Sequence, residues 1–224
     1  PRFNVPNTLA NPYLTGGTRS EFEVGTEVSF LNNRLGFDLT YYDRVDEDLP
    51  ISIPVPGSTG YSGLSINSGA SSTSGVELTL NATPIQSEDF RWDVSFNIAS
   101  IKKVTDKLYD GINSRVLDYM SWYSLQLQER VGEEWGTFVG RAPRTDDNGT
   151  PIYSASGRTQ YEGNQVLGNI LPDYTGGFST SFAYKNWNLD AGFDFQSGGL
   201  FSSTSNMFAY YSGMHMDTIG LNDK

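Results

Sequence analysis

The sequence predicts an all-β fold, made of six antiparallel strands that form part of a larger transmembrane β-barrel. Apolar and polar residues alternate in six segments, one face of every segment carries no charge, and short connections alternate with long ones. Alternation with a period of two is typical of a strand whose two faces meet different surroundings. A strand of about 11 residues is long enough to cross the ~25 Å apolar band of such a barrel.

The first two predicted strands span approximately residues 20–31 and 35–45. In both segments, aromatic and aliphatic residues alternate with glycine, small polar residues and carboxylates. Only Asn32-Asn33-Arg34 separates them, which is a connection short enough to join neighbouring antiparallel strands. The two segments therefore predict a hairpin.

The other four predicted strands form two more hairpins. They cover residues of about 73–83, 90–102, 174–184 and 187–198. A short link at 84–89 joins the first pair, and Lys185-Asn186 joins the second pair. Among the apolar positions of all six strands, only Thr26 and Thr180 are polar.

The remaining segments are predicted to be loops, at about 46–72, 104–173 and 199–224. Long loops at one end of the strands and short turns at the other are typical of an outer-membrane barrel, with the long loops outside the cell. A soluble β-sandwich that binds a ligand is the alternative, but long structureless loops are uncommon in compact soluble domains. The connections favour the barrel.

Composition excludes some classes of function and leaves others open. The net charge of -11 argues against nucleic acid as a partner. There is no cysteine for a disulfide or a thiolate metal site. The mean hydropathy of -0.40 would suit a soluble protein, but it also suits a barrel, in which only alternate strand residues meet lipid.

Six strands are too few to close a transmembrane barrel, and an open edge would leave backbone groups unpaired in lipid. We therefore expect further strands from residues outside this chain or from other protomers. The chain starts at Pro1 without a recognisable signal peptide, so we expect a fragment of a larger barrel.

Two motifs stand out along the chain. The first, E-x-G-x-x-x-x-F-x-x-N-R-L, runs from Glu23 to Leu35, and the second, L-G-N-x-x-P-D-Y-T-G-G, runs from Leu167 to Gly177. Together with several longer segments, they resemble the C-terminal barrel region of the SusC/RagA family of TonB-linked outer-membrane proteins. The resemblance covers nearly the whole chain, in residues 20–44, 51–85, 90–104, 131–141 and 166–199.

The resemblance implies a barrel of about 22 strands around an N-terminal plug, in the bacterial outer membrane and in contact with its lipid. It implies import of oligosaccharides or peptides, energised by TonB and assisted by a SusD-like surface lipoprotein that acts as a lid. The plug, the TonB-contacting segment and the final strands are expected outside this chain. The alternative is a barrel that serves as a structural component of a larger surface or secretion assembly.

The resemblance also raises the question of a calcium loop, because many relatives carry an acidic D-x-N-x-D-G run before the second motif. Asp146, Asp147 and Asn148 occupy that region here. The full spacing of oxygen ligands that Ca²⁺ requires is missing. We therefore expect an Asx turn near Asn148-Gly149 and no metal.

Carboxylates alternate with the apolar residues and would face the lumen or the plug of the barrel. They are Glu21, Glu23, Glu27, Asp38, Glu77, Asp93, Asp190 and Asp194. They either contact basic groups of the plug and steer substrate, or only keep a solvated barrel wall wet. No carboxylate is isolated in an apolar pocket, so acid–base catalysis is not expected.

Aromatic residues of the longest predicted loop are candidates for contact with substrate or lid. They are Tyr109, Tyr119, Trp122, Tyr123, Trp135 and Tyr153. Aromatic faces suit the recognition of sugars and peptides, and loops often carry binding function; packing against the lid partner is the competing interpretation. Within the same loop, residues 115–131 are predicted to form a short amphipathic helix.

The sequence offers no catalytic set. His215 is the single histidine and has no cysteine or acidic cluster around it, so a metal site is not expected. No phosphate-binding glycine motif is present. We expect no cofactor and no enzymatic activity.

Overall fold

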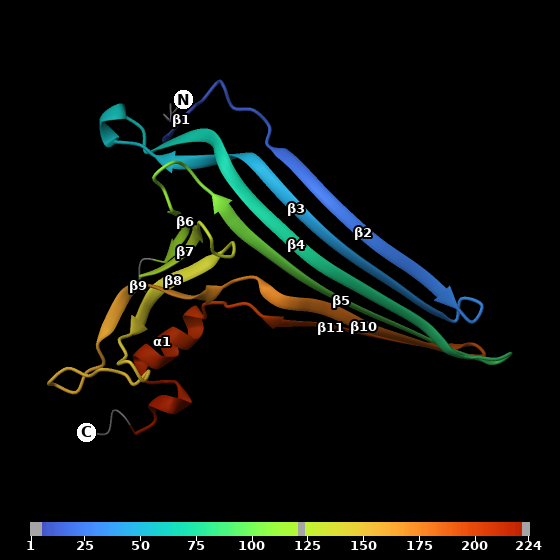
Figure 1. The fold of residues 1–224 in the computed structure, drawn as a ribbon. Helices are drawn as coiled ribbons and strands as arrows, with labels where there is room; N and C mark the ends of the chain where they lie inside the picture. Colours follow the sequence, from blue (N-terminus) through green and yellow to red (C-terminus); the bar gives the residue numbers. More distant parts are fainter. Residues whose placement is uncertain (1–5, 121–123, 221–224) are drawn as a thin grey trace, which may run out of the picture.

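The structure is a computed structural model that describes residues 6–120 and 124–220. These residues form one long, curved sheet and one smaller sheet. In Figure 1 the long strands run together from one end of the molecule to the other. Their short turns gather at one end, and the smaller sheet and helix α1 lie toward the opposite end.

The long sheet contains the six predicted strands, with neighbours in the order β11-β10-β5-β4-β3-β2. The strands are β2 (Thr18–Phe30), β3 (Leu35–Pro54), β4 (Gly63–Gln86), β5 (Phe90–Lys107), β10 (Pro172–Tyr184) and β11 (Trp187–Gly198). Every one of these neighbours pairs antiparallel. Strand β1 (Thr8–Leu9) adds a short parallel pairing to β4. The predicted fold class is confirmed.

Strand register aligns the apolar residues of all six strands into continuous rows on one face of the sheet. The central row contains Val28, Phe37, Leu80, Phe96, Phe178 and Phe193. Aromatic rings pack against one another on this face, as in the Trp92–Phe182 pair, whose ring centroids are 5.5 Å apart. We call this side of the sheet the apolar face and the other side the polar face.

No second sheet covers the apolar face within the described residues. Trp187 is 79% exposed, Leu189 66% and Phe193 63%. In a soluble sandwich this face would be buried against another sheet, whereas the outer face of a membrane barrel meets lipid. The uncovered apolar face therefore supports the barrel over the sandwich.

One of the two polar residues on the apolar face has a direct explanation. The Thr180 hydroxyl accepts a hydrogen bond of 2.8 Å from the indole N–H of Trp92 on the neighbouring strand. An indole N–H costs free energy when it is placed in an apolar medium without a partner. Thr180 thus allows a tryptophan to lie on a surface that otherwise lacks acceptors.

The short turns adopt the left-handed backbone that antiparallel hairpins often need. Leu31, Asn32 and Asn33 have φ values of 54°, 57° and 64°, and Lys185 has a φ of 53°. Asparagine tolerates this region better than most residues. The Arg34 N–H then donates to the Phe30 carbonyl at 3.1 Å, which completes the first turn.

The structure differs from the loop predicted at 46–72. Strand β3 continues to Pro54 and β4 begins at Gly63, so the hairpin projects well beyond the predicted strand ends. Only residues 55–62 connect the two strands, and they include a short 3-10 helix, η1 (Gly57–Thr59). Register shifts near Leu49 interrupt the regular alternation, which explains why it could not be followed there.

Much of the predicted 104–173 loop forms a second antiparallel sheet. Its strands are β6 (Ser114–Met120), β7 (Leu125–Arg130), β8 (Thr137–Pro143) and β9 (Tyr161–Asn169). The helix predicted at 115–131 is wrong, because 115–120 and 125–130 lie in the paired antiparallel strands β6 and β7. We call residues 108–171, between the end of β5 and the start of β10, the insert.

The predicted 199–224 loop contains helix α1 (Thr204–Ser212) and the short 3-10 helix η3 (Met216–Thr218). The Ser203 side chain caps the start of α1 by accepting from the Asn206 N–H, and Gly213 ends the helix in the left-handed region. Among the described residues, no helix is both long enough and apolar enough to cross a membrane.

A charge placed on the apolar face tests whether that face meets lipid. We expect Leu80→Arg to lower the free energy of unfolding from lipid vesicles by about 2–4 kcal/mol, the cost of arginine near the middle of a bilayer. The control is Thr79→Arg on the polar face, where Asp38 lies opposite, and it should have little effect. Urea titrations in vesicles measure both variants, and equal costs would contradict the assignment of the faces.

A glycine in β10 tests the packing between strands. A Cβ atom at Gly176 would lie 2.4 Å from the Asn97 carbonyl oxygen and 2.5 Å from the Phe195 ring. We expect Gly176→Ala to destabilise the protein by about 1–3 kcal/mol through overpacking. Gly192→Ala is the control, because nothing lies within 4 Å of its Cβ position. The same urea titrations measure the difference, and no difference would contradict the close approach.

Candidate functional site

All eight carboxylates that the sequence singled out lie on strands of the long sheet, on its polar face. Register places Glu27 opposite Asp38, and it joins Asp93 to Asp190 through Ser181 of the strand between them. The same rows contain many glycine, serine, threonine and asparagine residues. The polar face is therefore acidic and rich in small residues. The functional role of these carboxylates stays a prediction.

The Glu27–Asp38 pair carries an electrostatic cost. Like charges directly opposite each other in a sheet destabilise it. The Asp38 carboxylate accepts a hydrogen bond of 3.3 Å from the Thr40 hydroxyl, but among the described residues no basic side chain forms an ion pair with either carboxylate. A basic group brought to this part of the polar face would be attracted to it.

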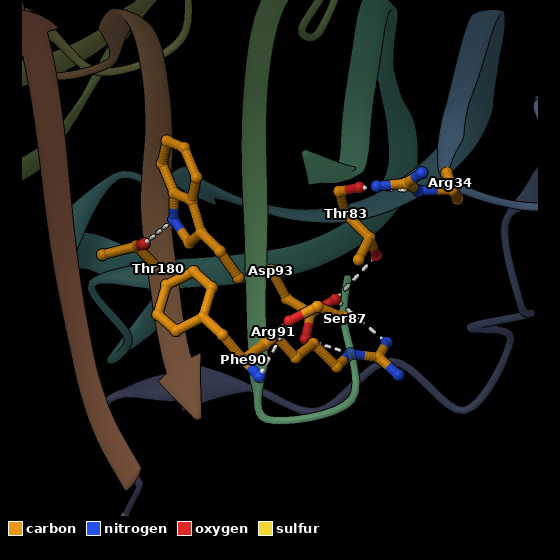
Figure 2. Close-up of polar contacts among 8 residues, drawn as sticks. Arg34, Thr83, Ser87, Phe90, Arg91, Asp93 and Thr180 are labelled. Atoms are coloured by element: carbon orange, nitrogen blue, oxygen red, sulfur yellow. Dashed lines mark hydrogen bonds and ion pairs between the residues drawn. The ribbon is translucent and has the colours of Figure 1, made fainter. Parts of the chain in front are cut away.

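Asp93 is different, because it is held in a polar network beside the short turns (Figure 2). Arg91 donates to both oxygens of its carboxylate, at 2.6 and 2.9 Å. The Thr83 hydroxyl donates to Asp93 Oδ1 at 2.7 Å. Arg34 binds the backbone carbonyls of Thr83 and Pro84 from the neighbouring turn. Asp93 thus serves the structure of this end of the sheet.

A hollow of about 550 Å³ lies across β4, β5, β10 and β11 near the same end. Polar side chains line most of it, among them Asn81, Ser95, Ser179 and Asp190. Within the described part of the chain, Asp190 forms no ion pair or side-chain hydrogen bond, unlike Asp93. Asp190 is therefore the carboxylate of the hollow that is available to a group from outside this chain.

At the opposite end of the polar face, a buried carboxylate was missed by sequence reasoning. Asp46 is 4% exposed. It forms ion pairs with Arg19 at 2.6 Å and Arg44 at 3.3 Å. Both Arg19 and Asp46 lie outside the predicted strand bounds, so their pairing across β2 and β3 could not be foreseen from the alternation.

The row that contains Asp46 continues through Ser71 to Thr105 and leads into the insert. The Thr105 hydroxyl donates to the Glu129 carboxylate at 3.4 Å, and Glu129 forms an ion pair with Arg115 at 2.5 Å. Because Thr105 lies on β5 and Glu129 on β7, these contacts attach the smaller sheet to the long one. Burial strengthens such polar contacts, which would be weak on an open surface.

Backbone hydrogen bonds make the same attachment. The Thr105 N–H donates to the Glu133 carbonyl at 3.1 Å, and the Trp135 N–H donates to the Lys103 carbonyl at 2.8 Å. The 131–135 segment therefore lies along the far part of β5, beyond the point where β10 ends its pairing. This middle segment of the insert therefore extends the long sheet beyond the point where β10 ends.

The second sequence motif forms the junction at which the insert ends. Asn169 donates from its side-chain amide to the Glu134 carboxylate and accepts from the Leu171 N–H at 2.7 Å. Gly168 has a φ of 138°, and a Cβ atom there would lie 2.5 Å from the Leu200 side chain. The glycine and asparagine of this motif thus have structural reasons to be present.

The predicted loop aromatics come from separate segments. Tyr119 on β6 is 51% exposed and Tyr153 is 58% exposed, while Tyr109 lies in a turn that bridges to Ile112. Trp135 is half-buried at the junction, with the Lys103 ammonium 5.4 Å from its ring. Trp122 and Tyr123 lie outside the described residues. Contact of these residues with substrate or lid stays a prediction.

The Asp146 segment forms the expected Asx turn. The Asp146 carboxylate accepts from the N–H groups of Asn148 and Thr150, both at 2.9 Å, and Gly149 has a φ of 80°. Across residues 6–120 and 124–220, no three His, Cys, Asp or Glu side chains gather in a way that could hold a metal ion.

The single histidine lies in a local aromatic cluster after α1. The His215 ring stacks on Tyr210 with centroids 3.9 Å apart, and the Tyr210 hydroxyl donates to Asp217 at 2.6 Å. That hydrogen bond raises the pKa of Tyr210 above its usual value. The cluster stabilises the end of α1 and the start of η3.

Comparison with known proteins finds that this chain is similar to several TonB-dependent receptors. TonB-dependent receptor P26 of Formosa agariphila is 29% identical over 212 residues, which cover 84% of this chain. TonB-dependent receptor SusC of Bacteroides thetaiotaomicron is 26% identical over 94% of this chain. The RagAB peptide importer in its open-open state matches with a TM-score of 0.66 and 25% identity, over 86% of this chain.

The chain is similar to SusC/RagA-type TonB-dependent receptors. The resemblance predicted from the two sequence motifs is thereby confirmed. No protein-family model matches the sequence. The chain spans about a fifth of the length of these SusC/RagA-type relatives, with 21% of receptor P26, 24% of SusC and 22% of the RagAB chain.

The same relatives confirm two further predictions. The similarity to SusC and RagAB agrees with the predicted outer-membrane location. The proteins that match are receptors and transporters, in agreement with the prediction that the chain is not an enzyme.

The Asn169–Glu134 contact provides a test of how the insert is held. Asn169→Asp keeps the acceptor for the Leu171 N–H but replaces the amide donor with a carboxylate that faces Glu134. We expect like-charge repulsion to loosen the junction and to speed proteolysis of the insert several-fold, without a change in the long sheet.

The matched control is the double variant Asn169→Asp with Glu134→Gln, in which the amide donor lies on the other side of the pair. It should restore resistance to proteolysis. Limited digestion followed by mass spectrometry measures the cleavage sites. Equal cleavage of the single and double variants would contradict a role for this contact.

Proposed function

We propose that the chain is a wall segment of a TonB-dependent importer that takes up oligosaccharides or peptides across the bacterial outer membrane. The similarity to SusC and to the RagAB peptide importer over most of the chain is the main support. The uncovered apolar face and the acidic polar face are what such a wall requires, since one meets lipid and the other meets an aqueous lumen.

In this function the polar face lines the lumen and contacts the plug. The Glu27–Asp38 pair and Asp190 have no basic partner within the described residues. Basic side chains of a plug would offset this charge and would hold the plug against the wall. The carboxylates thus act in positioning the plug and in repelling anionic solutes.

The insert lies at the end of the wall where the long connections gather, opposite the short turns (Figure 1). We infer that this end faces the outside of the cell, as the long loops of outer-membrane barrels do. A SusD-like lipoprotein would close over it as a lid, and TonB would act from the periplasm through a segment of the complete protein. The exposed Tyr119 and Tyr153 are candidates for contact with lid or substrate.

Growth and uptake in cells test the import function. We expect cells that lack the complete protein to lose uptake of one class of oligosaccharide or peptide, because the outer membrane excludes solutes of that size. The intact gene should restore uptake, and a form without its TonB-contacting segment should not. Labelled substrates inside washed cells give the measurement.

Affinity purification of the complete protein gives the second readout. Recovery of a surface lipoprotein with bound substrate is the expected result. Recovery of a secretion apparatus alone, with unchanged uptake of every substrate, would contradict import and would favour the structural assembly.

A further inference from the structure

The smaller sheet of the insert has an apolar face of its own. Register aligns Leu127 of β7 with Phe138 of β8, and aligns Phe138 with Gly168 of β9. Because Gly168 has no side chain, Leu200 from the segment after β11 packs into that position. Leu200 thus covers the end of the face at β9, and no described residue covers the end toward β6 in this way.

A hollow of about 310 Å³ lies over this uncovered end. Its lining is mainly apolar and comes from three strands of the sheet, from Ile170 after β9 and from the segment before α1. The apolar lining residues are Met120, Leu125, Leu127, Phe138, Ile170, Leu200 and Phe201. The space is large enough for one or two aliphatic or aromatic side chains, and small for a folded domain.

The hollow opens next to a free strand edge. In the part of the chain that the structure describes, β6 is the end strand of the smaller sheet and pairs only with β7. A free edge presents unpaired N–H and C=O groups, which a second extended strand can bind. Sugars lack the alternating N–H and C=O groups that this edge would pair with.

A carboxylate stands at the rim of the hollow, on the same strand. Asp118 and Met120 are two residues apart on β6 and both line the hollow. Among the described residues, the Asp118 carboxylate accepts only from its neighbouring Tyr119 N–H, at 2.8 Å, and its side chain is exposed. Residues two apart on an added strand would meet Asp118 and the hollow on one face.

We propose that the β6 edge binds an extended peptide that carries a basic side chain opposite Asp118 and an apolar side chain in the hollow, two residues apart. The proposal rests on the import function and names peptides as the substrate class. The free edge supplies backbone hydrogen bonds, the hollow selects an apolar side chain, and Asp118 attracts the positive charge. The site lies at the end of the wall where substrate would first arrive.

Binding of a labelled peptide to the complete protein in detergent tests the proposal. The probe is a hexapeptide, Thr-Lys-Thr-Leu-Thr-Gly, in which lysine and leucine are two residues apart. We expect Leu→Ser or Lys→Glu in the peptide to weaken binding by about tenfold or more. N-methylation of its backbone at the residues that face the edge should abolish binding, since it removes donors without changing the side chains.

Matched variants of the protein locate the binding. Asp118→Lys should weaken binding by about tenfold or more, because it reverses the charge at the rim. The control, Asp147→Lys, makes the same charge change in an exposed turn and should leave the affinity unchanged. Equal affinities of the two variants, or an N-methylated peptide that binds normally, would overturn the proposal.

Accessibility is measured separately, because another segment or the lid could occupy the edge. This chain has no cysteine, so the exposed Tyr119, beside Asp118 on β6, is replaced by cysteine in a complete protein whose other cysteines are changed to serine, which places one thiol at the edge and keeps the Asp118 carboxylate. Maleimide should label this thiol at a normal rate, and the hexapeptide should slow the labelling. A thiol that stays unreactive would overturn the proposal. If no peptide binds while an oligosaccharide is imported, the peptide site is refuted and the import function stands.

Discussion

The direct pairing of β5 with β10 is the interaction on which the rest of the structure depends. These strands lie on either side of the insert in sequence, yet ten residues of β10 are in register with β5, from Thr175 to Tyr184. The pairing carries the apolar rows from the first four strands to the last two. Without this pairing, β2 to β5 and β10 with β11 would form two separate sheets, and neither would present a continuous surface to lipid.

The same pairing separates two kinds of environment along β5. Its first part lies between β4 and β10, with an apolar side and a polar side. Its last part lies between β4 and the 131–135 segment of the insert, where Thr105 is fully buried. A single strand thus passes from a membrane wall into a packed polar junction. Because β5 stays paired with β4 along most of its length, the long sheet fixes the position of the insert segment that lies along β5.

The long sheet could be predicted because its alternation has one physical cause, an uncharged face that meets lipid. That cause acts on Phe37, Leu80 and Phe193 alike, and it leaves a period-two pattern in each strand. The insert lacks a common cause of this kind. Leu125 and Leu127 alternate with Gln126 and Gln128, but the preceding residues fit a helical pattern equally well, and tertiary pairing decided between them.

Some of the candidate side chains could be predicted from the sequence and others could not, for a related reason. The polar-face carboxylates follow from strand parity alone, so their positions could be inferred before the structure. The Arg19–Asp46 ion pair lies across β2 and β3 beyond the predicted strand ends, and the Asn169–Glu134 contact joins two separate segments of the insert. The first depends on how far the β2–β3 hairpin extends, and the second depends on how the insert folds. No local pattern around these residues indicates their partners.

The entry and exit of the insert have a consequence for the evolution of such barrels. Both ends of the insert attach to strands that are hydrogen-bonded neighbours, which are about 4.8 Å apart. Because the closure entropy of a loop rises only with the logarithm of its length, a longer or shorter segment could be exchanged at this seam with little cost to the wall. The long sheet can therefore carry outer segments of different length and sequence while its own strands stay unchanged.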